Sequence, residues 1–220
     1  VRIHRPTGAS AVLLDPASGE VLALANRPTV DANRFGNAPT TAQRNRAVTD
    51  RFEPGSTFKV VSLAACYDSG AVTPGDVIFC HNGYYDEGRG FKPFKDHSPY
   101  GNLPSGMVLA KSSNIGTYMM VKELGKHTLD TYIRDFGFGT PTGVRVPSES
   151  AGLLRRPAAW SAVSQASLAF GYEGLIASVQ LVAAYGSLAT GGVRVSPTLG
   201  GGFGECVGGV PWRWLREGVR

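Results

Sequence analysis

The amino-acid sequence predicts a mixed α/β protein of the α+β type, with a strand hairpin first and a mostly helical block after it. Two short apolar runs, residues 9–15 and 20–26, flank the turn-forming tetrad PASG and predict an antiparallel hairpin. The segments after the hairpin have helical rather than strand patterns, so strands and helices do not alternate along the chain. A doubly wound parallel sheet is therefore not expected.

The helical block follows a polar, irregular segment at residues 27–50. Residues 57–69 carry apolar side chains around most of the helix surface, which predicts a buried helix that Gly70 ends. Residues 79–106 are rich in glycine, proline, lysine and tyrosine and predict a long loop with one short strand near residues 83–91. Further helices are expected at residues 104–124, 128–136, 158–169 and 178–189, and the segment VRVSPTL near residue 193 could begin a strand.

Composition and charge exclude several functional classes. The chain of 220 residues is 42% hydrophobic and 18% charged, which is typical of a globular protein. The net charge of +5 comes without blocks of like charge or basic residues interleaved with aromatic ones, so no nucleic-acid partner is expected. Cys66, Cys80 and Cys206 lack paired spacing, and the four histidines are scattered. Neither a disulfide framework nor a metal site is predicted, and no cofactor is expected.

The sequence has no targeting or membrane signal. No apolar run reaches the roughly 20 residues that a transmembrane helix needs, and the first residues do not resemble a signal peptide. Because the chain opens on Val1 in strand-like sequence, we interpret it as an excised or processed segment.

The first candidate for chemistry is the stretch RFEPGSTFK, in which Ser56 follows a Pro-Gly turn and Lys59 comes three residues later. Residues at i and i+3 lie on one helix face, so the Lys59 amine can reach the Ser56 hydroxyl. The helix start supplies backbone N–H groups where an oxyanion would form, and burial would lower the pKa of Lys59 so that it can act as a base. The alternative is structural: Ser56 caps the helix, and Lys59 extends to solvent.

The second candidate is KSSN, residues 111–114, which contains an S-x-N pair formed by Ser112 and Asn114. A hydroxyl could transfer a proton between a lysine base and a leaving amine, and an amide could hydrogen-bond a peptide substrate. A polar helix face or cap would have the same composition. The two motifs are more specific together than either is alone, because S-x-x-K with a later S-x-N is typical of penicillin-binding proteins and their relatives.

The chain resembles the transpeptidase domain of class B penicillin-binding proteins, the FtsI-like peptidoglycan D,D-transpeptidases. TGASAVLLDPASGEVLALANRPTVDANRF is similar to the hairpin that opens this domain, and NRAVTDRFEPGSTFKVVS to its nucleophile segment. LAKSSNIGTYMMVKELG is similar to the second motif, and two later segments, FGFGTPTGVRVPSESAGLLRRP and FGYEGLIASVQLVAAYGSLATGGVRVSPTL, also match. The resemblance covers roughly residues 8–199 and implies a serine β-lactamase/transpeptidase-like fold, with a helical subdomain packed on an antiparallel sheet.

The resemblance implies roles for four residues. Ser56 would be the acylated nucleophile, Lys59 its general base, Ser112 a proton carrier and Asn114 a ligand of the substrate's peptide bond. The implied partners are peptidoglycan stem peptides ending in D-Ala-D-Ala, β-lactams, and other cell-wall synthesis proteins. The implied location is the extracytoplasmic face of the bacterial cytoplasmic membrane, with the anchor outside this chain.

The sequence departs from the family at its C-terminal end. It contains neither K-T-G nor K-S-G, the third family motif, which supplies a carboxylate-binding cation and one wall of the cleft. We therefore interpret residues 1–199 as a partial transpeptidase domain, C-terminally incomplete, and residues 200–220 as a Gly-rich tail that does not resemble the family. The last sheet strands are expected to be missing and the activity of this chain to be reduced.

Two alternatives remain at this point. A class D β-lactamase also uses S-T-F-K, but that family has an apolar residue at the position of Asn114 and lacks the E-P-G lead-in. A non-catalytic relative that acts as a scaffold module would also fit a chain without the third motif. Labelling by a fluorescent penicillin and turnover of a β-lactam distinguish these possibilities.

Overall fold

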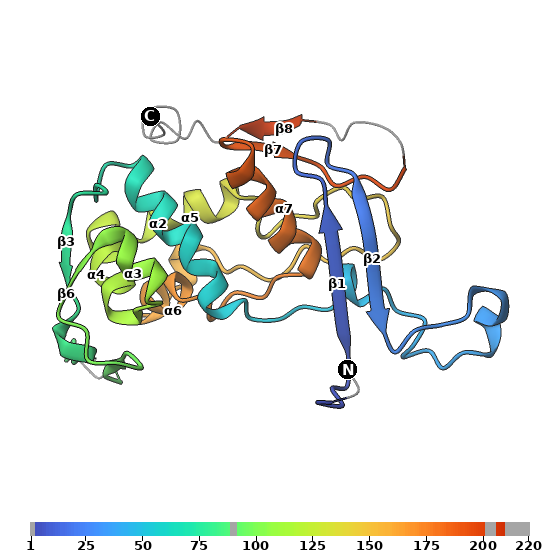
Figure 1. Cartoon of the computed structure of the whole chain (residues 1–220), viewed down its shortest axis with the longest axis horizontal. Helices are drawn as coiled ribbons and strands as arrows, with labels where there is room; N and C mark the ends of the chain where they lie inside the picture. The colour runs from blue at the N-terminus through green and yellow to red at the C-terminus, as the bar shows by residue number, and fades with distance from the viewer. Residues whose placement is uncertain (1–2, 89–91, 201–205, 210–220) are drawn as a thin grey trace. The chain divides into compact units, whose positions relative to one another are not determined.

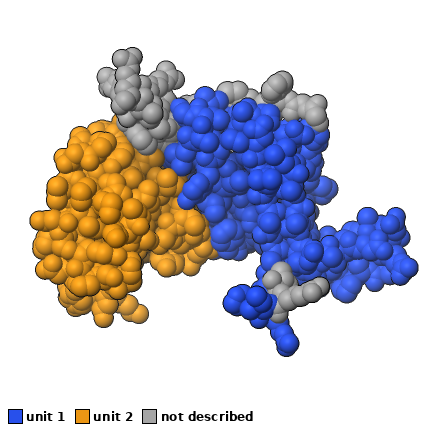
Figure 2. Space-filling view, in the orientation of Figure 1, with its two compact units in different colours: residues 1–52, 136–153, 175–211 blue, residues 53–135, 154–174, 212–220 orange. Residues whose placement is uncertain are grey.

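The structure is a computed structural model that describes residues 3–88, 92–200 and 206–209. The chain forms two compact units, which Figure 2 shows in different colours. Unit 1 comprises residues 1–52, 136–153 and 175–211, and unit 2 comprises residues 53–135, 154–174 and 212–220. Among the described residues, none of the helices combines the length and hydrophobicity needed to cross a lipid bilayer.

Unit 1 begins with the predicted hairpin, strands β1 (Ala9–Leu14) and β2 (Val21–Arg27), which pair antiparallel (Figure 1). In the turn, the Asp15 carboxylate accepts hydrogen bonds from a backbone N–H and a side chain that follow it. Gly19 has φ +78°, and a Cβ there would lie 2.5 Å from the Ser196 carbonyl oxygen. The turn therefore requires glycine both for its conformation and for the space.

The rest of unit 1 packs around this hairpin. The helix α7 (Ser178–Ala189) lies at the residues predicted for it, and it contacts both β1 and the strand β7 (Val193–Val195). The short helix α1 (Arg46–Thr49) contacts α7 and both hairpin strands, and β7 pairs antiparallel with β8 (Cys206–Gly209). The 3-10 helix η1 (Ala32–Asn37) lies within the segment predicted to be irregular. β8 falls within the predicted Gly-rich tail, whose residues 201–205 and 210–220 lie outside the described residues.

One buried glutamine connects two of the stretches of chain that form unit 1. The Gln180 Nε2 donates to the carbonyl oxygens of Thr140 (2.8 Å) and Ala151 (3.1 Å), and its Oε1 accepts from Ala177 N (2.9 Å). A buried amide with all these partners stabilises the unit, whereas one without them would destabilise it. The apolar core beside it consists of Val48, Val144, Ala177 and Val179, with Val21 and Val146 against it.

Unit 2 is mainly helical (Figure 1). Its helices are η2 (Gly55–Phe58), α2 (Lys59–Asp68), α3 (Ser105–Ala110), α4 (Asn114–Leu124), α5 (Lys126–Asp135), η4 (Pro157–Ala159) and α6 (Ser164–Ala169). α2 packs against α4, α5 and α6, and most of its side chains are buried, as the sequence predicts. Gly70 follows it with φ +75°.

The long loop of unit 2 contains short paired strands. β3 (Val77–Phe79) pairs with β6 (Asn102–Pro104), and β4 (Tyr84–Tyr85) pairs with β5 (Phe94–Lys95). A 3-10 turn, η3 (His81–Gly83), precedes β4. The single short strand predicted near residues 83–91 is β4, and residues 89–91 lie outside the described residues.

Two predicted helices of unit 2 are not continuous. Residues 158–169 form η4 and then α6, because Ser161 N donates to the Ser164 side chain (2.9 Å) and α6 starts only there. Residues 104–124 form α3 and α4, which are separated at Ser112. The break at Ser112 lies within KSSN, the second of the two predicted motifs.

Candidate active site

Ser56 lies in η2, the 3-10 turn that runs directly into α2. The residue before it, Gly55, has φ +58°, and the cap position is Pro54, which has no side chain able to accept a hydrogen bond from the helix start. Ser56 is exposed, whereas Phe58 two residues later is buried. Ser56 is thus not the helix cap, and its hydroxyl faces solvent at the positive end of the helix.

Lys59 is one of the most buried side chains of the protein, with 1% of its surface exposed. Its Nζ donates to the Ser112 carbonyl oxygen (2.6 Å) and to Ser112 Oγ (3.1 Å). Burial lowers the pKa of Lys59 to about 8, and the Asp96 carboxylate partly opposes this change. Within the described chain, no hydrogen bond joins Lys59 to Ser56, so the amine is held by the second motif.

Ser112 has φ +54°, in the left-handed region that glycine usually occupies. It follows the end of α3: Ser112 N donates to Leu109 O (2.9 Å) and Ser113 N to Val108 O (3.0 Å), which is the Schellman pattern of a helix end. A serine in this conformation costs roughly 1–2 kcal/mol. The strain is offset by the surrounding structure and directs both oxygens of Ser112 to Lys59.

A carboxylate from the long loop holds the start of α4. Asp96 accepts hydrogen bonds from Ser113 Oγ (2.6 Å), Asn114 N (2.5 Å) and Ile115 N (3.2 Å). Ser113 is the helix cap and accepts from Gly116 N (2.8 Å). Two of the three hydrogen bonds that Asp96 accepts come from backbone N–H groups. Its carboxylate therefore offsets the positive potential at the start of α4.

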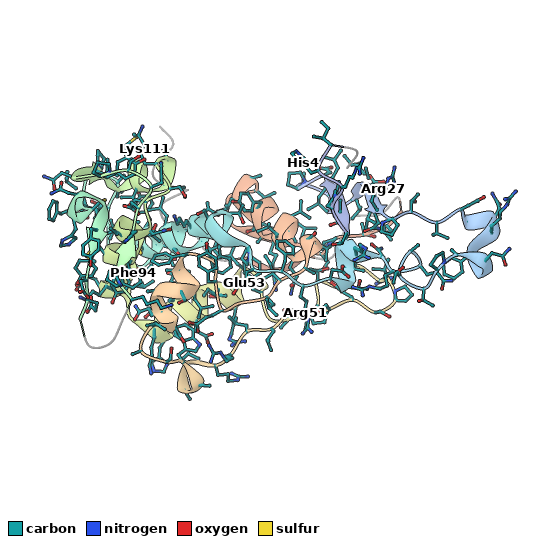
Figure 3. The ribbon with its side chains drawn as sticks, turned by 90° about the horizontal axis from the view of Figure 1, so that it is seen from below. His4, Arg27, Arg51, Glu53, Phe94 and Lys111 are labelled. Carbon is teal, nitrogen blue, oxygen red and sulfur yellow. The ribbon has the colours of Figure 1, made fainter. Side chains whose placement is uncertain are left out.

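The ring of Phe94 positions this loop. Phe94 lies 4.9 Å from the ring of Tyr118 on α4 and 5.7 Å from the ring of Phe170 after α6, measured between centroids. The Asn114 side-chain amide donates to the carbonyl of Lys95 in the same loop (3.1 Å). Figure 3 labels Phe94 in the loop and Lys111 at the end of α3.

The structure thus brings Lys59 and Ser112 into contact and places Ser56 on the turn that leads into the helix of Lys59. Asn114 lies at the start of α4, with its amide on the loop carbonyl. Sequence reasoning missed Asp96. Its only signal is a carboxylate in a polar loop, and nothing local links that loop to KSSN.

An exposed hydroxyl, a buried amine with a lowered pKa and a second hydroxyl on that amine can perform acyl transfer through a covalent ester. In the part of the chain that the structure describes, no group of three or more His, Cys, Asp or Glu side chains is arranged to hold a metal ion.

Comparison with known proteins finds similar sequences. The family model "Penicillin binding protein transpeptidase domain" matches residues 9–205. The chain is 35% identical over 193 residues to "Probable peptidoglycan D,D-transpeptidase PenA" of Neisseria gonorrhoeae, which covers 88% of this chain and 32% of that protein. It is 34% identical over 198 residues to "Peptidoglycan D,D-transpeptidase FtsI" of Escherichia coli, with 88% and 32% covered. The chain therefore spans about a third of the length of these relatives.

The fold has solved counterparts. Penicillin binding protein 3 of Mycobacterium tuberculosis in complex with aztreonam superposes with a TM-score of 0.78 at 35% identity, over 87% of this chain and 43% of that one. The predicted fold class, a serine β-lactamase/transpeptidase-like arrangement of mixed α/β content, is confirmed by this similarity.

Proposed function

The chain belongs to the penicillin-binding protein transpeptidase domain family, and we propose that it is part of a peptidoglycan D,D-transpeptidase. This enzyme would cross-link the cell wall through a serine acyl-enzyme. The observation that carries the proposal is the buried Lys59 amine, which is bound to Ser112 and lies on the helix that Ser56 precedes. In this proposal residues 1–199 form the partial transpeptidase domain and residues 200–220 a Gly-rich tail, into which the family match extends as far as residue 205.

We propose the following sequence of steps. Ser56 Oγ attacks the carbonyl of a stem peptide ending in D-Ala-D-Ala while neutral Lys59 accepts the hydroxyl proton. The backbone N–H of Ser56 stabilises the oxyanion. The peptide bond breaks, D-Ala leaves with a proton passed through Ser112, and the donor peptide remains as an ester on Ser56. The amine of a second stem peptide then attacks the ester and restores the Ser56 hydroxyl.

The lowered pKa of Lys59 gives this mechanism its base. With a pKa of about 8, a useful fraction of the amine is neutral near neutral pH, whereas at its usual value of 10.5 almost none would be. Asn114 is proposed to hydrogen-bond the substrate's peptide group. β-Lactams would acylate Ser56 because their amide replaces the scissile bond.

The proposed location is the extracytoplasmic face of the bacterial cytoplasmic membrane, where stem peptides are cross-linked. The proposed partners are those peptides, β-lactams and other proteins of cell-wall synthesis. The names of the relatives, which are peptidoglycan transpeptidases, support this assignment.

A fluorescent penicillin tests the proposal. The 220 residues contain no K-T-G or K-S-G motif, so they lack the family's carboxylate anchor. We expect this chain to label slowly, by about 100- to 1000-fold relative to a version extended with a family K-T-G strand, the factor that one lost oxyanion donor costs other hydrolases. The extended version should label at Ser56 and lose the label on Ser56→Ala but not on Ser69→Ala. Labelling that survives Ser56→Ala would overturn the assignment, and rapid turnover of the penicillin would favour a hydrolase.

A further inference from the structure

The turn before Ser56 touches a second turn that is far away in the sequence. Gly55 N donates to the carbonyl oxygen of Gly171 (3.0 Å). A Cβ on Gly171 would lie 2.1 Å from the Gly55 carbonyl oxygen and 2.7 Å from Gly55 N. The two backbones therefore meet at a distance that only glycine allows at position 171.

The end of α6 explains how Gly171 reaches this place. Gly171 N donates to Leu168 O (2.9 Å) and Tyr172 N to Ser167 O (2.8 Å), which is the Schellman pattern. Gly171 has φ +83°, as this helix end requires. Gly55 lies where a side chain on Gly171 would have to be placed.

A second contact joins the same two segments. Glu173 N donates to Glu53 Oε1 (3.0 Å), and Glu173 itself has φ +59°. The Glu173 carboxylate accepts from Ser164 Oγ (2.6 Å) and pairs with Arg155. The loop at residues 171–173 is thus fixed by an ion pair and a helix end, and it contacts both ends of the 53–55 segment, which belongs to the same unit. Figure 3 labels Glu53, which is exposed.

We propose that Glu53 and Gly171 are positioning residues for Ser56: the turn at residues 53–55 and the loop at residues 171–173 form a two-point clamp that fixes the Ser56 hydroxyl and backbone N–H. The proposal rests on Ser56 being the nucleophile proposed above. Because Ser56 directly follows Gly55, a displacement of the turn moves the attacking oxygen and the oxyanion donor together. Misplacement by about 1 Å can slow a reaction by about 100-fold.

The competing explanation is that Gly171 only ends α6. Gly70 provides a matched control, because it follows α2 with φ +75° and no atom lies within 4 Å of a Cβ at that position. Gly171→Ala and Gly70→Ala therefore introduce the same backbone strain, and only Gly171→Ala also clashes with the nucleophile turn.

The test uses the full chain and two readouts. The first is acetylation of Ser56 by p-nitrophenyl acetate, followed by peptide mass spectrometry, since this uncharged ester needs no carboxylate anchor. The second is amide hydrogen exchange at Gly55 and Glu173. We expect Gly171→Ala to slow acetylation by about tenfold or more and to accelerate exchange at Gly55, while Gly70→Ala stays within about twofold of the unmodified chain. Glu53→Ala should slow acetylation and expose Glu173 N–H to exchange, and Glu53→Gln, which keeps the acceptor oxygen, should restore both.

The outcomes separate the clamp from the proposed function. If Gly171→Ala and Gly70→Ala behave alike, or if Glu53→Ala equals Glu53→Gln, the clamp is wrong. If Gly171→Ala does not fold, the Glu53 pair decides alone, because that side chain is exposed. If Ser56 of the unmodified chain is not acetylated, the proposed function fails. Amide hydrogen exchange at Gly55 and Glu173 then still decides whether the clamp holds the turn.

Discussion

The starts of α2 and α4 carry the two halves of the candidate active site, and they are built in parallel. A residue in the left-handed region lies shortly before each helix: Gly55 with φ +58° opens η2, which runs into α2, and Ser112 with φ +54° precedes the cap of α4. At both positions the chain turns sharply and presents a serine hydroxyl. Each turn is fixed by a partner more than ten residues away in the sequence.

The two starts differ in the charge of that partner. Asp96 places a carboxylate on the first N–H groups of α4, whereas the start of η2 and α2 has no side-chain cap in the described chain and is held by the Gly171 carbonyl and by Glu53 acting on the opposite loop. An anion at a helix start offsets its positive potential. The positive potential at the helix start beside Ser56 is therefore left to stabilise a developing oxyanion. At the start of α4 the Asp96 carboxylate offsets this potential and fixes the position of the helix.

The largest effect is expected when Lys59, the proposed base, is replaced. Lys59→Met should slow acetylation of Ser56 by about 100- to 10,000-fold, the range for loss of a general base. Because Met removes the donor to Ser112 O and Ser112 Oγ, the melting temperature of Lys59→Met is measured beside the rate to show that the variant is folded. The matched control is Lys95→Met at an exposed lysine. A reaction rate unchanged in Lys59→Met would mean that Lys59 is not the base.

The second effect is on stability and concerns the pH range between the folded and ordinary pKa values of Lys59. The folded pKa is about 8 and the ordinary value is 10.5, so the unfolded chain binds more protons in this interval. The contribution of Lys59 to the free energy of unfolding should therefore rise with pH from about 8 to 10.5, by on the order of 3 kcal/mol.

Urea denaturation of the unmodified chain and of Lys59→Met measures this rise as a difference. The comparison is needed because burial raises the pKa of Cys66 to about 12 and also raises that of Tyr132, so both groups lower stability at high pH in the two chains alike. Parallel pH profiles of the two chains would contradict the lowered pKa of Lys59.

Removing the anion from the start of α4 should have an intermediate effect. Asp96→Ala leaves three donors without their acceptor and should destabilise the fold by about 1.5–3 kcal/mol, the range for hydrogen bonds to charged groups. Asp96→Asn keeps an acceptor oxygen and should destabilise it less. Because the charge that raises the pKa of Lys59 is gone, the pH at which acetylation reaches half its maximum should fall in Asp96→Asn. A rise of that pH would contradict the assigned sign.

The smallest effect comes from adding an anion to the start of α2. Thr57→Asp places a carboxylate in the first turn and should make the fold more stable than Thr57→Asn by about 0.3–1 kcal/mol, since both variants lose the hydrogen bond from the Thr57 hydroxyl to Pro54 O. The same charge opposes the oxyanion, so acetylation of Ser56 should slow by a few fold and recover in high salt. Thr57→Asn, which loses the same hydroxyl without adding charge, is the control for both measurements. Faster acetylation in Thr57→Asp would break the comparison between the two starts.

The sequence allows prediction of the parts of this fold that depend on local patterns. The hairpin, the buried helix of Lys59 and the bounds of α7 follow from periodicity and turn residues within a dozen positions. The direction of the Lys59 pKa also follows, because an apolar helix surface implies burial. These features need no knowledge of distant partners.

The rest depends on contacts between distant segments. Asp96 lies 18 residues before Asn114, and Gly171 lies far from Gly55, so no local pattern pairs them. The break at Ser112 is hidden because serine is an acceptable helix residue, and the contact of Lys59 with the serine, which helps to hold the left-handed conformation, comes from a distant segment. The clamp and the anion-capped helix start therefore become visible only in the folded structure.

The division into two units has a consequence for biosynthesis. Unit 1 is assembled from three separate stretches of chain, and Gln180 on α7 joins two of the later ones, so this unit stays incomplete until translation has passed α7. Most of unit 2 lies between the first two stretches, so its helices can pack together before the partners of the hairpin have been synthesised. Domains fold as units during synthesis, which proceeds at about 5–20 residues per second. The nascent hairpin therefore carries an unpaired edge for several seconds, which makes it the segment on the emerging chain that chaperones have most reason to protect.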